Sequence, residues 1–350
     1  MKKNEFNRII FGSLFPKKNL ALCLDKKNTE YIYDFSKKYF LSGFVLAGND
    51  FQNNPILLNK LSTHNRKLAL KKIVLLDDLR KLEVSLKEKG INYVLMKGVA
   101  YESIKLFNSN LRQFRDIDLL VDKADLKEAF ESILELDYEY ETKLANNKCI
   151  HLYNKNHLPV LINKNKTAIE LHHRVTNPTI YKECPLTEYF FSNSKKNNIP
   201  DIPGLIMHSL YHAFQHHQLK QGPIYIFDVL KLLDRISADE ILNNKYIKTM
   251  NLEKDLARMI DLKNSIKDKN VLDYSFEQLP VDPNQFYKEK PNDEKYSLLF
   301  NNNQSQKLTI SLLLEKLRFY KYKYQTNFIS LKFILVIILE FIQNLKKIKI

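Results

Sequence analysis

Apolar residues recur at three- and four-residue intervals through most of the chain, which predicts a largely helical protein. The composition agrees, because only 7 glycines and 11 prolines interrupt 350 residues. The predicted helices cover residues 29–46, 64–89, 99–107, 124–136, 203–219, 224–237 and 311–344. The polar stretch 270–303 predicts a long loop.

A different pattern, short β-rich runs separated by turn residues, occupies the middle of the sequence. The candidate strands are residues 91–96, 117–121, 138–140, 150–153, 160–163 and 168–171. The fold class we expect is therefore α+β, with a small mixed sheet of about five strands flanked by helical segments. We divide the chain into an N-terminal helical region (1–90), an α/β core (91–180) and a C-terminal helical region (181–350).

Cysteine usage and the N-terminus bear on the cellular compartment. Cys23, Cys149 and Cys184 are widely spaced and form no CxxC motif, which argues against a cysteine-based zinc site and against a disulfide framework. The first 18 residues lack an uninterrupted apolar stretch and a small-residue cleavage site, so we do not expect a signal peptide. Both features predict a cytoplasmic protein.

One apolar segment, residues 328–342, calls for a membrane test. It is shorter than the roughly 20 residues that span a bilayer, and it contains Lys332 and Glu340. We therefore expect no stable transmembrane anchor and interpret the segment as a buried helix. Peripheral membrane contact by residues 328–350, whose end is rich in lysine, is the alternative.

The net charge of +15, from 55 Lys and Arg against 40 Asp and Glu, favours anionic partners. RNA, nucleotides and an acidic membrane face all fit this excess. Genome composition explains the same excess without any partner, so charge alone does not select among them.

The segment 97–121 carries the chemistry. Asp116 and Asp118 lie two residues apart in a predicted strand, so both carboxylates project from one face. Such a pair is costly unless a cation lies nearby, and oxygen ligands favour Mg²⁺. The alternative is a solvated strand edge balanced by Arg112 and Arg115.

Three neighbouring features strengthen the metal interpretation. Lys97 and Gly98 stand at a strand-to-helix turn, where backbone amides can approach an anion. The guanidinium groups of Arg112 and Arg115 are suited to binding phosphate beside the carboxylates. Glu170 is an isolated acid in the apolar strand 167–171, which is expensive unless it is exposed or paired with a cation.

The order Lys-Gly, helix, Arg-x-x-Arg-Asp-Ile-Asp-Leu-Leu-Val and later Glu-Leu-His resembles the nucleotidyltransferase superfamily that includes DNA polymerase β. In particular, it is similar to a bacterial family of uncharacterised nucleotidyltransferases. The resemblance covers roughly residues 60–235 and is most specific over residues 96–121.

This resemblance implies roles for residues of this chain. Asp116, Asp118 and Glu170 would be the catalytic metal ligands, with Asp118 bridging two Mg²⁺ ions, for which Mn²⁺ could substitute. The residues implied to bind the nucleoside triphosphate or lie beside it are Lys97, Gly98, Arg112, Arg115, His212 and Asp228.

The implied reaction transfers a nucleoside monophosphate from an NTP to an acceptor and releases pyrophosphate. The acceptor would be a small molecule, a sugar or a peptide. Two alternatives remain open: a toxin-like enzyme that modifies tRNA or another RNA, and a catalytically inactive binding protein that keeps the fold. No P-loop and no Gly-x-Gly-x-x-Gly motif occurs, which argues against P-loop ATPases and kinases.

His208, His212 and His216 recur every four residues on one face of the predicted helix 203–219. That spacing suits a transition metal. No cysteine or carboxylate completes a zinc set nearby in the sequence, so a polar packing face is the simpler interpretation.

Overall fold

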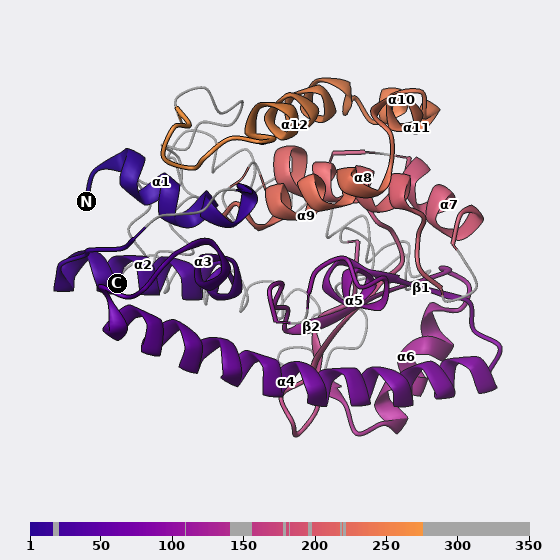
Figure 1. Ribbon diagram of the computed structural model, residues 1–350. Coiled ribbons are helices and arrows are strands. Elements are labelled where there is room, and N and C mark those ends of the chain that lie inside the picture. The colour runs from indigo at the N-terminus through magenta and orange to yellow at the C-terminus, as the bar shows by residue number, and fades with distance from the viewer. Residues whose placement is uncertain are drawn as a thin grey trace, which may run out of the picture. The chain divides into compact units, whose positions relative to one another are not determined.

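The computed structural model describes residues 1–16, 21–108, 110–140, 156–177, 180–181, 183–194, 198–217, 219 and 222–275. The chain divides into two compact units, residues 1–291 and 292–350, and all described residues belong to the first unit (Figure 1). The predicted helix 311–344, the candidate strand 150–153 and most of the predicted loop 270–303 lie outside the described residues.

A five-stranded mixed sheet forms the centre of the first unit, in the order β1-β2-β5-β4-β3. Its strands are β1 (Tyr93–Met96), β2 (Asp116–Val121), β3 (Glu139–Tyr140), β4 (Leu161–Ile162) and β5 (Ala168–His172). The neighbours β2 and β5 are parallel, and the other three pairs are antiparallel. The α+β class expected from the sequence is confirmed.

Helices precede and follow the sheet and are inserted between its strands. The N-terminal ones are α1 (Lys3–Phe11), the short 3₁₀ turn η1 (Gly12–Leu14), α2 (Lys26–Lys38), α3 (Ser42–Gly48) and α4 (Pro55–Glu88). Between strands lie α5 (Lys97–Ser103) and α6 (Leu126–Glu135). After β5 come α7 (Pro185–Ser192), α8 (Ile202–Leu210), the π-helical turn η3 (Tyr211–His216), α9 (Ile224–Leu232), the 3₁₀ turn η4 (Leu233–Arg235), α10 (Ala238–Leu242), α11 (Lys245–Thr249) and α12 (Glu253–Ile266).

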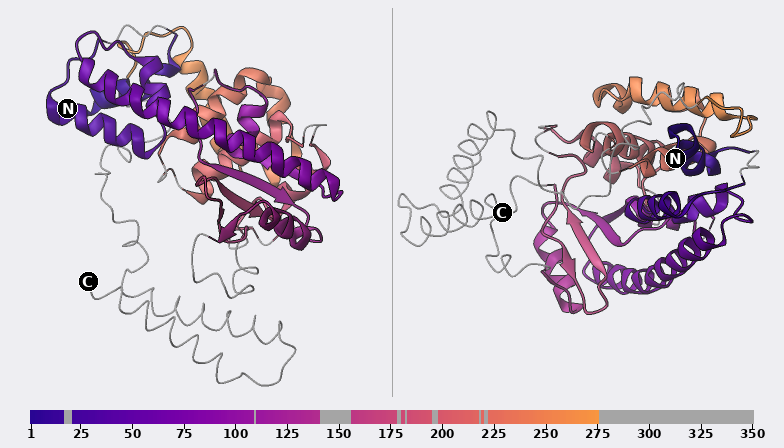
Figure 2. Two further views of the ribbon diagram at one scale, coloured as in Figure 1. Left: turned by 90° about the horizontal axis from the view of Figure 1, so that it is seen from below. Right: turned by 90° about the vertical axis from the view of Figure 1, so that its left-hand side faces the viewer.

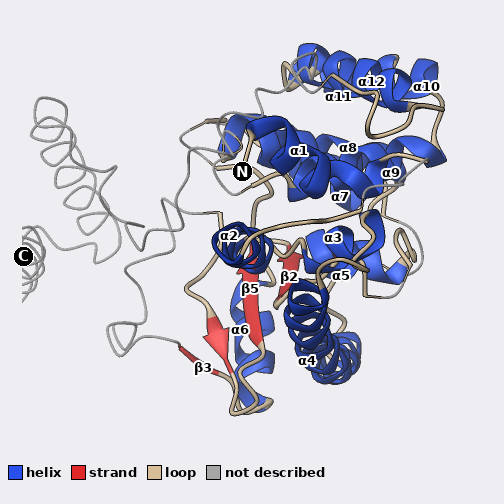
Figure 3. Ribbon diagram, turned by 60° about the vertical axis from the view of Figure 1, so that its left-hand side comes forward, coloured by secondary structure: helices blue, strands red, loops and turns tan. Residues whose placement is uncertain are grey.

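The long helix α4 runs along one side of this unit, and α12 lies on the opposite side (Figures 1 and 2). Helix α4 begins at Pro55, and the side chain of Asn54 just before it accepts a hydrogen bond from the Leu57 amide at 3.0 Å. Its first turns pack against α2 and α3, and later turns pack against α6 and β2 (Figure 3). The helix lies within the predicted N-terminal region, residues 1–90, but it packs against elements of both that region and the core.

A buried carboxylate fixes α4 to the sheet. Asp78 Oδ2 accepts hydrogen bonds from Thr167 Oγ1 at 2.6 Å and from Asn163 Nδ2 at 2.8 Å. Asn163 and Thr167 bracket the turn between β4 and β5, so this contact sets the position of β5 relative to the helix.

Two of the predicted helices are interrupted in the structure. The expected helix 29–46 is broken: α2 ends at Lys38, Phe40 adopts φ 57°, and α3 starts at Ser42. A bulky residue with positive φ cannot continue a right-handed helix, so the chain turns there. The expected helix 203–219 begins as α8 but continues as the π-helical turn η3, which no simple apolar repeat predicts.

Candidate active site

The register of the parallel pair β2–β5 brings two acidic side chains together. Asp118 on β2 is the direct partner of Glu170 on β5. Residues that pair in register project from the same face of a sheet, so the two carboxylates face the same space. Asp118 is only 1% exposed, whereas Glu170 is partly open to solvent.

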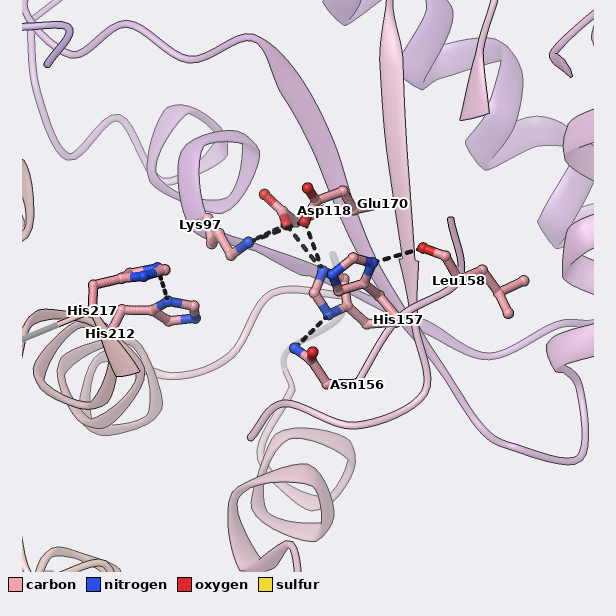
Figure 4. A network of polar contacts seen from close by, with 9 residues as sticks. Lys97, Asp118, Asn156, His157, Leu158, Glu170, His212 and His217 are labelled. Carbon is pink, nitrogen blue, oxygen red and sulfur yellow. Dashed lines mark hydrogen bonds and ion pairs between the residues drawn. The ribbon is translucent and has the colours of Figure 1, made fainter. Parts of the chain in front are cut away.

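Two nitrogen groups approach the same pair of carboxylate oxygens (Figure 4). Lys97 Nζ lies 2.5 Å from Asp118 Oδ1 and 3.4 Å from Glu170 Oε2. His172 Nε2 lies 3.1 Å and 3.4 Å from those same two oxygens. Asp118 Oδ1 and Glu170 Oε2 therefore stabilise positive charge in the space between them.

Protonation states follow from this arrangement. Burial is the largest influence on the pKa of Lys97 and would lower it, but the charges of Asp118 and Glu170 together raise it above its ordinary value. Burial also opposes the pKa shifts of His172 and Glu170, since it acts to lower the first pKa and to raise the second. The hydrogen bonds to Asp118 and Glu170 raise the pKa of His172, and those with His172 and Lys97 lower the pKa of Glu170.

Asp116 lies on the same face as Asp118, as the sequence predicted, but its strand partner is Ala168. Burial, together with the negative charge of Asp118, raises the pKa of Asp116 to about 6, against the opposing charges of Lys97 and Arg115. The raised pKa therefore reflects burial first and the neighbouring negative charge second.

The residues fit a divalent cation. One oxygen from each of Asp118 and Glu170 and a ring nitrogen of His172 lie within 4.8 Å of one another. Carboxylate oxygens suit Mg²⁺ and Mn²⁺, and the imidazole nitrogen adds a ligand of the kind that transition metals accept. Asp116 is outside this close group, although its charge acts on it.

Gly98 is buried at the start of α5, and its surroundings explain the absence of a side chain. A Cβ at this position would lie 2.4 Å from Phe114 Cβ and 2.5 Å from Phe114 Cγ. Glycine is therefore required for close packing between α5 and the loop before β2. Contact between Gly98 and a triphosphate stays a prediction.

The two arginines implied to bind phosphate have different surroundings. Arg112 donates from Nε and Nη2 to the two oxygens of Asp228, at 2.9 Å and 3.0 Å, and in this ion pair Asp228 is buried while Arg112 is 11% exposed. Arg115 is exposed, and its guanidinium lies 4.3 Å from the centre of the Phe40 ring. Arg115 is thus available to an anion, whereas Arg112 and Asp228 neutralise each other. Phosphate or substrate contact by Arg112 and Asp228 stays a prediction.

His212 is 4% exposed and belongs to a group of aromatic side chains around η3. Its Nδ1 lies 3.2 Å from His217 Nε2, and its ring stacks on Tyr225. Burial lowers the pKa of His212 well below its ordinary value, and it lowers the pKa of His217 to about 3. Both rings are therefore neutral at physiological pH.

A family model described as "Uncharacterised nucleotidyltransferase" matches residues 38–265. The chain belongs to this nucleotidyltransferase family. The match covers the sheet, Lys97, both aspartates, Glu170 and the histidine-bearing turn, so the resemblance seen in the sequence is confirmed at the level of the family. Transfer of a nucleotidyl group is accordingly the class of reaction that the family assigns to the chain.

Two solved structures show weak similarity. The antibiotic-resistance factor ANT(2'')-Ia has 10% sequence identity and a TM-score of 0.36, with 54% of this chain and 94% of that chain covered. An antigenic nucleotidyltransferase-like protein from Paracoccidioides brasiliensis has 15% identity and a TM-score of 0.33, with 57% and 93% covered. At these scores neither supports a statement about substrates. No curated protein matches the chain.

His172 belongs to the group that could hold a metal ion, and the sequence interpretation did not assign it to the candidate site. The signal was present, because His172 follows Glu170 by two residues and side chains alternate along a strand. The predicted strand ended at residue 171, one residue before the strand ends in the structure.

Within the part of the chain that the structure describes, no helix is both long enough and apolar enough to cross a bilayer. The segment 328–350, for which peripheral membrane contact was considered, lies outside the described residues. A cytoplasmic location stays a prediction.

Proposed function

We propose that this protein transfers a nucleoside monophosphate from an NTP to an acceptor, with Mg²⁺ bound by Asp116, Asp118 and Glu170. The observation that supports this most strongly is the convergence of Asp118 Oδ1 and Glu170 Oε2 on one point that already holds the Lys97 ammonium. A site that stabilises an ammonium group between two carboxylates also suits a divalent cation.

When bound, Mg²⁺ would lower the pKa of the attacking hydroxyl and stabilise the charge on the departing pyrophosphate. Asp118, the most buried of the three carboxylates, would be the central ligand. Glu170 lies directly across from Asp118 on β5, and Asp116 lies two residues earlier on β2.

Lys97 and Arg115 supply positive charge from the chain itself. Lys97 reaches the carboxylates from the first residue of α5, and its partly exposed side chain can also face a triphosphate. Arg115, stacked on Phe40, presents a planar set of donors that suits phosphate oxygens. Together they would neutralise charge that develops on the triphosphate.

The acceptor we propose is a small molecule, a sugar or a peptide. RNA is the second candidate, and the observation that favours it is the net charge of +15. A binding surface that follows an RNA backbone would give a steep dependence on salt, which a small acceptor would not.

The test incubates the purified protein with each α-labelled NTP, Mg²⁺ or Mn²⁺, and either total RNA or a small-molecule extract. Asp118→Asn removes a central ligand at constant size, and Asp122→Asn is the matched control on the exposed end of the same segment. We expect label transfer by the wild type and the control. For Asp118→Asn we expect a loss greater than the roughly 10–100-fold that removal of an outer-shell partner costs.

The labelled fraction identifies the acceptor class. The binding of each NTP is measured in parallel, because transfer also fails when the acceptor is missing. Equal Mg²⁺-dependent NTP binding by the wild type and Asp118→Asn, together with no transfer by either, would overturn the proposal in favour of an inactive binding protein.

A further inference from the structure

Outside the carboxylate pair, the described residues contain a second cluster of side chains able to bind a metal. One ring nitrogen from each of His212, His216 and His217 lies within 4.8 Å of the other two. The sequence pattern had grouped His208, His212 and His216 instead. The structure thus replaces His208 by His217 in this set.

The π-helical turn explains this exchange. In an α-helix residues i and i+4 are neighbours, but a π-helical turn hydrogen-bonds i to i+5. Here the His217 amide donates to the His212 carbonyl at 3.0 Å. The wider turn places His217 directly against His212, five residues earlier, without removing His216 from the group. π-Helical turns of this kind often occur at functional sites.

The spacing of the ring nitrogens suits a shared ion. Two nitrogens that bind one tetrahedral Zn²⁺ at about 2.0–2.1 Å are separated by about 3.3–3.4 Å. His212 Nδ1 and His217 Nε2 are 3.2 Å apart, so both could bind the same ion after a shift of a few tenths of an ångström. A hydrogen bond between two neutral rings explains the same distance, and a second observation is therefore needed.

That observation is a buried polar atom with no hydrogen bond. His212 is 4% exposed, and its Nε2 has no hydrogen-bond partner among the described residues. An unsatisfied buried ring nitrogen costs roughly 1–3 kcal/mol. A metal ion bound through Nε2 would satisfy this atom, whereas an ion bound through Nδ1 would replace the contact with His217.

The surroundings separate this cluster from bulk water on one side. The Tyr225 ring stacks on both His212 and His217, with ring centres 5.5 Å and 5.8 Å away. His216 and His217 remain partly exposed, so an ion could enter from that direction.

We propose that His212, His216 and His217 form a transition-metal site, best suited to Zn²⁺, that is distinct from the Asp118–Glu170 pair. Neutral imidazoles select zinc-like ions over Mg²⁺, whereas carboxylate oxygens do the reverse. No cysteine or carboxylate among the described residues joins the group. Three protein nitrogens leave a fourth position for water or a substrate atom, the arrangement of zinc sites that take part in chemistry.

The experiment uses the full chain, freed of metal with a chelator, and Co²⁺ as a coloured probe of Zn²⁺ sites. We expect one equivalent of Co²⁺ to bind with the visible absorption of a nitrogen-ligated ion, and Zn²⁺ to displace it. His217→Asn should weaken binding by more than the roughly 10–100-fold cost of losing an outer-shell partner. His217 is partly exposed, so this variant is less prone to misfold than one at His212.

Two controls keep the result interpretable. His64→Asn removes an imidazole on α4, outside the cluster, and should bind Co²⁺ as the wild type does. Asp118→Asn should also retain binding, because the carboxylate pair is not part of this site. Absence of Co²⁺ binding by a folded wild type at tens of micromolar would overturn the proposal. So would binding that is lost in Asp118→Asn and kept in His217→Asn, because the ion would then belong to the carboxylate site.

Discussion

Arg112 on the loop before β2 holds Asp228 on α9 through two hydrogen bonds, at 2.9 Å and 3.0 Å. Asp228 is buried and Arg112 is largely shielded from solvent, and the loop continues directly into Arg115, Asp116 and Asp118. The ion pair therefore fixes the entry of the strand that carries the proposed metal ligands.

Breaking this pair should destabilise the fold strongly. Asp228→Asn leaves a buried guanidinium without its counter-charge, and we expect a loss of about 3–5 kcal/mol in the free energy of unfolding. Denaturant titration measures it, with Arg115→Ala as the exposed control. Replacing both partners, as in Arg112→Met with Asp228→Leu, should cost less than the sum of the single changes. A near-zero effect of Asp228→Asn would show that the pair has no structural role and leave direct phosphate binding as the explanation.

Lys97 should compete with the metal ion. Its ammonium lies 2.5 Å from Asp118 Oδ1, so a divalent cation must displace it or tolerate its charge. Lys97→Met should therefore strengthen Mn²⁺ binding without nucleotide by about tenfold or more. The same change should lower kcat/KM for the NTP, since the triphosphate loses a counter-charge.

Calorimetric titration with Mn²⁺ and the labelled-NTP assay measure these two opposite effects on one variant. Lys164→Met, an exposed lysine in the turn between β4 and β5, is the control. Weaker Mn²⁺ binding by Lys97→Met would mean that Lys97 organises the carboxylates rather than competing for them.

Asp78 is expected to contribute more to stability than its sequence neighbour. Asp78→Ala leaves the donors of Thr167 and Asn163 unsatisfied in a buried position and should cost about 2 kcal/mol or more. Asp77→Ala removes only an exposed ion pair with Lys81 and should change the free energy of unfolding far less, because solvent screens such a pair. Thermal unfolding of the two variants side by side distinguishes them, and equal effects would contradict the prediction.

His64 on α4 predicts a dependence of stability on acidity. Burial, followed by the charges of Lys37, Lys67 and Lys71, lowers the pKa of His64 below its ordinary value. The unfolded chain then binds a proton at His64 before the folded chain does, so this residue makes the fold less stable as the pH falls below about 6.5. Above that pH, proton binding by His64 no longer changes the free energy of unfolding.

The measurement compares the free energy of unfolding at pH 7 and pH 5.5 for the wild type and His64→Gln. We expect the wild type to lose more stability over this interval than the variant, because the other histidines are common to both proteins. Identical losses would show that the proton affinity of His64 does not change on folding.

The sequence predicted those parts of the site that follow from local periodicity. Asp116 and Asp118 share a strand face because side chains alternate, and the structure shows this arrangement. The pairing of Asp118 with Glu170 depends on the register between β2 and β5, which are separated by a long connection and which no local pattern specifies. The cost of an isolated acid in a strand suggested only that Glu170 is exposed or paired with a cation, and the family resemblance grouped it with the two aspartates.

Two features could not be read locally. The partner of Arg112 is Asp228, 116 residues away, so the sequence offered an arginine beside two aspartates and no sign that its guanidinium was already paired. The break at Phe40 was hidden for another reason. The apolar repeat runs across residues 29–46, and a change to positive φ leaves no trace in hydrophobic periodicity.

The single helix α4, 34 residues and about 50 Å long, determines which fragments of this protein can exist alone. Its Leu57 and Leu61 pack in the N-terminal helical region, while Asp78 accepts a hydrogen bond from Thr167, the residue just before β5. A fragment that starts at residue 91 would retain every carboxylate of the candidate site, yet it would expose the apolar side of the sheet that α4 covers. It would also lack Phe40, whose ring stacks against the guanidinium of Arg115. Residues 1–90 are therefore needed for the candidate site to fold, and a fragment without them should lose the arrangement of its carboxylates.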